Sequence, residues 1–246
     1  MTTRPNQSDG TSVAPSASGH SAGGPSPTGQ DEPADPEPKP RIYLDLIDED
    51  EAWGAVPDRE MLIRAAVAAV ATHPASALTL LSFLTDARPV ATDAEAVVVL
   101  TTDDEVAALN HQFRGKLGPT NVLSFPAPSP PPGANASASA IASASASARA
   151  GAETGPTLAL GDIVLAAETV FREAREMATK VEHHLQHLVV HGLLHLLDYD
   201  HLTAEDADAM ERLETDILAA LDVPDPYAGS EPEAMSPVAA TRVETP

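Results

Sequence analysis

Residues 180–201 read KVEHHLQHLVVHGLLHLLDYDH and form the most strongly patterned segment of the chain. From Lys180 to Leu197 the apolar residues recur at helical spacing, which predicts one long helix with an apolar face. Histidines at positions i and i+4 project from the same side of a helix, one turn apart. The sequence therefore predicts that His191 and His195 present their imidazoles together.

A third histidine follows at i+10, where a continuous helix cannot bring it back to the first two. The segment LLDYDH, residues 196–201, is predicted to break the helix and return His201 to the same point. Three imidazoles can bind a zinc ion at about 2.0–2.1 Å and leave a fourth position open, as in catalytic zinc sites. Because the chain contains no cysteine, thiolate ligands and disulfides are excluded. We predict one Zn²⁺ per chain, bound by His191, His195 and His201.

The H-x3-H-x5-H spacing is also that of metzincin proteases, which place a glutamate general base directly after the first histidine and a glycine three residues after the second. Those two positions are Gly192 and Asp198 here. Without the glutamate, peptide hydrolysis lacks its usual proton acceptor, so Gly192 marks a departure from the proteases. Asp198 is predicted to adopt a left-handed backbone conformation, at a cost of roughly 1 kcal/mol relative to glycine.

Three further histidines precede the motif. His187 lies one turn before His191 and is predicted to line the site, because a fourth protein ligand would close the metal. His183 and His184 are predicted to lie on the exposed side of the helix.

Strands and helices are predicted to alternate along the rest of the chain. Strand patterns occupy residues 41–48, 95–101, 121–126 and 159–166. Helical patterns occupy residues 57–73, 102–113, 168–177 and 203–222. The apolar run 95–101 is predicted to be buried on both faces. The fold class predicted is α+β (mixed α/β), a single domain with one mixed sheet of about four strands, helices on its faces and a central metal-binding helix.

Composition sets the predicted limits of this domain. Residues 1–40, 127–156 and 228–246 are rich in Pro, Ala, Ser, Gly and Thr without a core-forming period, which predicts two disordered tails and a low-complexity insertion around and within a domain spanning 41–227. Residues 65–85 carry no charge, but their His-Pro break favours a helix, a turn and a buried segment over a membrane span. The absence of a secretory pattern and of cysteine predicts a cytoplasmic protein.

The net charge of −23 argues against a nucleic-acid partner, since phosphate binding relies on lysine and arginine. However, no acidic residue occurs from Val106 to Ala152, whereas Arg114, Lys116 and Arg149 do. A locally positive surface is therefore compatible with the acidic composition.

Several separated motifs resemble those of one family. HGLLHLLDYDH is similar to the HGxLHLxGYDH signature of the YbeY family of bacterial endoribonucleases, which are rRNA maturation factors. Residues 109–126, LNHQFRGKLGPTNVLSFP, resemble a second signature, LNxxYRxKDxPTDVLSFP, and residues 160–165, LGDIVL, resemble a third. Residues 213–227 also resemble the way these chains end. The sequence departs from the pattern at Asp198, at Asn121 and in the insertion.

The resemblance implies a metal-dependent endoribonuclease that cleaves single-stranded RNA, matures the 3′ end of 16S rRNA and acts in ribosome quality control. It makes His191, His195 and His201 the zinc ligands, with Arg114 and His191 the residues on which catalysis depends. A guanidinium at Arg114 is suited to bind a phosphate in two-point contact. The partners implied are precursor 16S rRNA and the ribosome or its small-subunit proteins, with neither DNA nor a membrane expected.

Two alternatives remain open from the residues. The histidine spacing suits a zinc peptidase, which Gly192 opposes. A non-catalytic ribosome-assembly factor with a structural zinc is the other, which the open coordination position and Arg114 oppose.

Overall fold

The structure, a computed structural model, describes residues 40–86, 91, 93–128 and 157–228. All of them fall in one of the two units into which the chain divides, Pro38–Pro246. The predicted tails and the low-complexity insertion lie almost entirely outside the described residues, so the domain limits remain a prediction.

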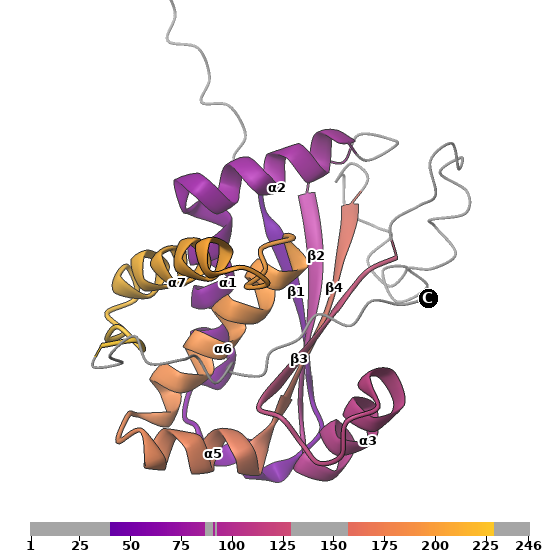
Figure 1. Ribbon diagram of the computed structural model, residues 1–246, viewed down its shortest axis with the longest axis vertical. Coiled ribbons are helices and arrows are strands. Elements are labelled where there is room, and N and C mark those ends of the chain that lie inside the picture. Colours follow the sequence, from indigo (N-terminus) through magenta and orange to yellow (C-terminus); the bar gives the residue numbers. More distant parts are fainter. Residues whose placement is uncertain (1–39, 87–90, 92, 129–156, 229–246) are drawn as a thin grey trace, which may run out of the picture. The chain divides into compact units, whose positions relative to one another are not determined.

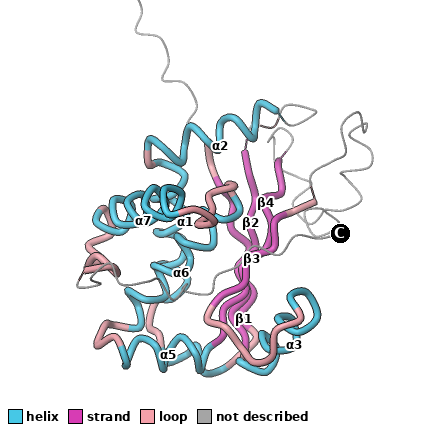
Figure 2. The backbone as a smooth tube through the Cα atoms, viewed as in Figure 1, coloured by secondary structure: helices cyan, strands magenta, loops and turns pink. Residues whose placement is uncertain are grey.

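The described residues form four strands and seven helical elements, of which two, a short 3-10 helix and a helix that begins at Pro74, were not predicted. In chain order they are β1 (Ile42–Asp48), the short 3-10 helix η1 (Glu51–Ala55), α1 (Arg59–Thr72), α2 (Pro74–Asp86), β2 (Asp93–Thr101), α3 (Asp103–Arg114), β3 (Val122–Pro126), β4 (Thr157–Ala166), α5 (Ala167–Glu176), α6 (Val181–Leu196) and α7 (Ala204–Ala219). The sheet order is β1-β2-β4-β3, with β3 antiparallel to β4 and the other pairs parallel. The predicted mixed α/β fold with one mixed four-stranded sheet is confirmed (Figures 1 and 2).

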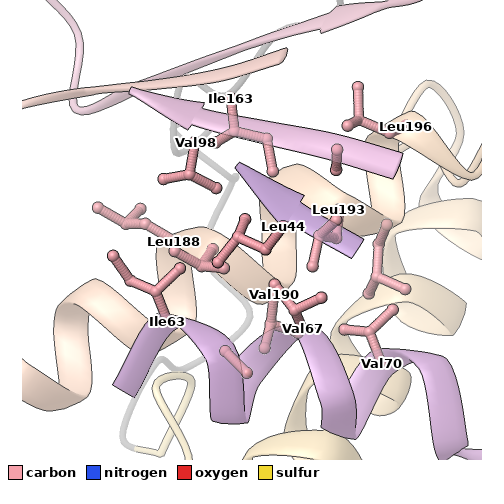
Figure 3. Packing of buried hydrophobic residues seen from close by; sticks show 14 of the residues in the cluster. Leu44, Ile63, Val67, Val70, Val98, Ile163, Leu188, Val190, Leu193 and Leu196 are labelled. Carbon is pink, nitrogen blue, oxygen red and sulfur yellow. The ribbon is translucent and has the colours of Figure 1, made fainter. Parts of the chain in front are cut away.

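The two faces of the sheet are covered unequally. Helices α1, α6 and α7 lie on one side, and α3 lies on the other (Figure 1). The main core forms between the sheet and the pair α1 and α6, where Leu44, Val98 and Ile163 of three strands pack with Ile63 and Leu188 (Figure 3). A smaller cluster between α3 and the sheet contains Val106, Leu123, Val164 and Ala166. Helix α6 is therefore held at the centre of the larger core.

The prediction that residues 95–101 are buried on both faces is wrong. Along β2, fully buried residues alternate with partly exposed ones: Ala94, Ala96, Val98 and Leu100 are buried, while Glu95, Val97 and Val99 are not. Successive side chains of a strand point to opposite faces, and α3 covers only part of the second face. The apolar run reflects strand propensity as much as burial.

The uncharged segment 65–85 folds as two helices that meet at Pro74, and its second half is a helix where a buried segment was predicted. Leu80 and Leu84 of α2 pack into the core, whereas Leu78 is 69% exposed. In the described part of the chain, no single helix has the length and apolar character to cross a membrane. Helices α1 and α2 reach the length and apolar character of a membrane span only when they are counted together, and the pair bends by 79° at the break between them.

A polar network ties the start of β3 to α5 and α6. The Asn121 side-chain amide donates to Glu173 Oε2 at 2.9 Å, and its oxygen accepts from the Val122 backbone N–H at 2.7 Å. His184 lies 3.0 Å from the same Glu173 oxygen and is 4% exposed. The predicted exposure of His184 is therefore wrong, because Glu173 supplies a partner that makes its burial favourable. His183, one residue earlier, is half-buried.

Asn121→Asp is expected to lower the free energy of unfolding by about 1–3 kcal/mol at neutral pH, because it places one carboxylate against another. Burial raises the pKa of Glu173, but the hydrogen bonds from His184 and Asn121 lower it overall. In the variant the two carboxylates repel each other, which raises the pKa of one of them in the folded state above its unfolded value. A group whose pKa is raised in the folded state lowers the free energy of unfolding as the pH rises through its pKa values.

Denaturant unfolding at two pH values checks this. The deficit relative to the parent protein should be smaller near pH 4.5 than near pH 7.5. An equal deficit at both would mean that the loss does not arise from carboxylate repulsion.

Candidate metal centre

Gly192 fixes how closely α6 approaches the sheet. A Cβ at this position would lie 3.0 Å from Ile163 Cγ2 and 3.1 Å from Ser124 Oγ, and the Ser124 hydroxyl donates to the Gly192 carbonyl at 3.3 Å. Residue 192 therefore faces β3 and β4. A glutamate here, as in the metzincins, would be directed into the sheet, so the position cannot supply a general base to the histidines.

His191, His195 and His201 come together as the sequence predicts. One ligand nitrogen from each lies within 4.8 Å of the others. His191 and His195 are buried on α6, and the His201 side chain, after the break, is 22% exposed. The Nε2 atoms of His191 and His195 are 3.1 Å apart. Two nitrogens bound to one tetrahedral zinc ion lie roughly 3.3 Å apart, given bonds of about 2.0–2.1 Å.

The turn after α6 returns His201 through a left-handed residue. Asp198 has φ 66°, which confirms the conformation predicted for it. The next residue, Tyr199, accepts a hydrogen bond from His195 Nδ1 through its carbonyl at 3.0 Å. Its hydroxyl lies 2.9 Å from Thr79 Oγ1 on α2. The turn is therefore anchored both to a histidine of the site and to a separate helix.

Asp198→Gly is expected to raise the free energy of unfolding by about 0.5–1 kcal/mol, because glycine adopts a positive φ without the steric cost that a Cβ brings. Thermal unfolding of the metal-free protein measures it. Zinc content should stay the same, because the substitution leaves the backbone path to His201 unchanged. A variant that is less stable than the parent protein would contradict this account of the turn.

Glu214 of α7 lies behind the histidines, and sequence reasoning missed it. This fully buried residue contacts His191 Nδ1 through Oε1 at 2.7 Å and His187 Nε2 through Oε2 at 3.1 Å. Oε2 also accepts a hydrogen bond from the Tyr227 hydroxyl. Burial alone would raise the pKa of Glu214, but His191 and His187 lower it far below its usual range, so the group is a carboxylate. His187 therefore lies beside the site and contacts Glu214 rather than the other histidine nitrogens, which agrees with the prediction that His187 lines the site.

These partners determine the tautomers of two site histidines. A carboxylate and a backbone carbonyl can only accept hydrogen bonds, so the Nδ1 atoms of His191 and His195 both carry a proton and donate it. When both rings are neutral, both Nε2 atoms are bare, and these two atoms lie 3.1 Å apart. Burial, with the nearby His191 and His201, lowers the pKa of His195 to about 4, so this ring is neutral at neutral pH. Two bare nitrogens at this separation can bind one shared cation, and His201 can add a third, so the residues present fit a zinc ion.

Arg114 is the last residue of α3, a helix that lies on the other side of the sheet from α6 (Figure 1). Ser124 of β3 contacts Gly192 on α6, whereas its neighbour Phe125 packs against Phe113 of α3 with ring centroids 5.2 Å apart. Both terminal nitrogens of Arg114 are buried and lack a hydrogen-bond partner in the described part of the chain. Burial lowers the pKa of this guanidinium.

A mixed α/β domain with three histidines converging on one point defines a class of metal-binding proteins with an open coordination position. The family model described as Endoribonuclease YbeY matches residues 67–222. A protein named Endoribonuclease YbeY from Bradyrhizobium sp. (strain BTAi1) is 41% identical over 181 residues, which cover 74% of this chain and 89% of that protein. The chain belongs to the YbeY endoribonuclease family, as its motifs indicate.

Two further relatives carry the same name. The protein from Rhodopseudomonas palustris (strain HaA2) is 46% identical over 136 residues, or 55% of this chain. That from Allorhizobium ampelinum is 46% identical over 139 residues, or 56% of this chain. The matched segment spans 63% of the length of the first and 71% of the second.

Proposed function

We propose that this protein is a metal-dependent endoribonuclease that cleaves single-stranded RNA, with precursor 16S rRNA as its substrate. In this proposal His191, His195 and His201 bind one zinc ion. The observation that carries the proposal is the 3.1 Å separation of the His191 and His195 Nε2 atoms, in two rings whose Nδ1 atoms each face a hydrogen-bond acceptor. Imidazole nitrogens suit zinc among the common divalent ions.

A zinc ion with three protein ligands supplies a Lewis acid and lowers the pKa of water at its open position. The chain's own residues orient the site. His195 and His191 are fixed by Tyr199 and Glu214, and the partial exposure of His201 gives a substrate access from solvent. A structural zinc in an assembly factor normally has four protein ligands, so the three-histidine set favours the enzyme.

Arg114 is proposed to bind the scissile phosphate or the one next to it. Its two terminal nitrogens, which have no hydrogen-bond partner among the described residues, form a fork that matches two phosphate oxygens, and RNA would supply those acceptors. Because α3 and α6 lie on opposite sides of the sheet, a bound strand would pass the edge strand β3 to meet both Arg114 and the histidines. The guanidinium would then stabilise charge that develops on the phosphate during cleavage.

The peptidase alternative is opposed by the direction of residue 192, which faces the sheet. Purified, zinc-loaded protein should be assayed on a 3′-extended 16S RNA fragment and on an unstructured protein such as casein, with His191→Ala as the control for contaminating nuclease. Cleavage of the RNA alone, absent in the variant, is the expected result. Cleavage of casein, or equal RNA cleavage by the variant, would overturn the proposal.

A further inference from the structure

Three hydrogen-bond donors converge on one buried carboxylate behind the histidine site. His191 Nδ1 reaches Oε1 of Glu214, and His187 Nε2 and the Tyr227 hydroxyl reach Oε2. Glu214 is fully buried, and none of these partners is an arginine or lysine. Burying a carboxylate without a permanently charged partner costs folding free energy, so a carboxylate in the apolar face of α7 indicates a role other than stabilising the fold.

From this arrangement we infer that Glu214 is the positioning residue of the metal centre. Glu214 accepts a hydrogen bond from the Nδ1–H of His191, which holds the ring in the tautomer whose Nε2 is bare. The same hydrogen bond fixes the orientation of the imidazole ring. The inference rests on the proposed zinc site, and it assigns to α7 a part in that site that histidine spacing alone cannot reveal. In this inference Glu214 would contact neither the metal nor the substrate.

His187 and Tyr227 hold Glu214 in place. His187 lies one turn before His191 on α6, and Tyr227 lies in the segment after α7. The Glu214 carboxylate therefore accepts hydrogen bonds from two separate parts of the chain. The carboxylate oxygen that faces them is not the one that faces His191. Burial, and the neighbouring Glu214, raise the pKa of Tyr227, so its hydroxyl stays protonated and donates. Loss of the Tyr227 hydroxyl should therefore leave the Glu214 contact with His191 in place.

His187, His191 and Glu214 could also be taken as a second metal site, since their ligand atoms lie within 4.8 Å of one another. Glu214 already accepts hydrogen bonds from His191 at 2.7 Å and from His187 at 3.1 Å, and an ion bound by these atoms would have to displace both of the protons that are shared there. A positioning role for Glu214 predicts one zinc ion per chain, whereas a second metal site predicts two.

The test compares Glu214→Gln with Asp216→Asn, a matched loss of one charge at an exposed position of the same helix. Zinc affinity is measured by competition with a chromophoric chelator, and zinc content by elemental analysis. Glu214→Gln should weaken zinc affinity by about 10- to 100-fold, as loss of a carboxylate behind a metal-bound histidine does elsewhere. Asp216→Asn should leave it unchanged, and Tyr227→Phe should weaken it less than Glu214→Gln does.

A second readout does not depend on zinc. Long-range ¹H–¹⁵N correlation spectra of the metal-free parent protein should show His191 as the Nδ1–H tautomer, and Glu214→Gln should shift it towards a mixture. An Nε2–H tautomer in the parent protein would overturn the inference even where the variant does not fold. Unchanged affinity in Glu214→Gln, or two zinc ions per chain, would also overturn it. If the parent protein binds no zinc at all, the proposed centre fails instead.

Discussion

His195→Ala is expected to remove bound zinc and to lower RNA cleavage by more than the 10- to 100-fold that loss of a supporting residue costs. His195 is fully buried, and its Nε2 lies 3.1 Å from that of His191, so the substitution removes one of the two nitrogens that α6 presents to the site. Removal leaves two ligands for an ion that needs at least three from the protein. Elemental analysis and single-turnover cleavage of the same preparation measure both effects.

His183→Ala is the matched control, since His183 lies on the same helix but is outside the triad. It should keep both zinc and activity. A His195→Ala protein that keeps its zinc would show that the ion is bound elsewhere. One that loses zinc but keeps its full rate would show that cleavage does not use the metal.

Arg114→Ala is expected to lower the cleavage rate by about 10²–10³-fold with zinc content unchanged, the range found when a donor to developing negative charge is removed. The effect on binding should be much smaller. Only about two to three phosphates can be neutralised by Arg114 and Lys116, so the salt dependence of binding should already be shallow, at about −0.7 per contact. The variant should lose roughly one contact from that slope.

Arg175→Ala controls for the loss of a positive charge, because Arg175 is exposed on α5 and bonds to a carbonyl of its own helix. Single-turnover rates and salt titrations of all three proteins separate binding from chemistry. Equal loss of binding and of cleavage in Arg114→Ala would reduce this residue to a phosphate contact, and an unchanged rate would remove it from the mechanism.

The histidine triad and the order of strands and helices could be predicted because they depend on short-range patterns. Spacing along one helix places His191 and His195 on the same side, and the acidic break with a left-handed Asp198 returns His201. The helix starts at Thr102 and Thr203 follow from capping, and each side chain accepts a backbone N–H as expected.

Contacts between distant elements could not be predicted in the same way. The partner of His184 is Glu173 on the preceding helix, and that of His191 is Glu214 on the following one. One signal was present: Met210, Leu213, Ile217 and Leu218 form the buried face of α7, and Glu214 interrupts it. A carboxylate in an apolar stripe is rarely buried without a partner, so it could have been assigned to the histidines.

Gly192 is a second case in which a contact between distant elements could not be predicted from the sequence. Its departure from the protease pattern is visible in the sequence, but the reason lies in the tight contact with Ile163 and Ser124, which belong to other strands. The burial of β2 was misjudged because an apolar run cannot reveal how much of the second sheet face α3 covers.

The most direct test of the metal-dependent mechanism is a zinc titration of chelator-treated protein, with cleavage of a single-stranded 3′-extended 16S RNA fragment as the readout. The metal-free protein should be inactive, and activity should rise linearly and reach its plateau at one equivalent of zinc per chain. His195→Ala, titrated in parallel, should stay inactive throughout. Full cleavage by protein shown to contain no metal, or activity that ignores added zinc, would contradict the account.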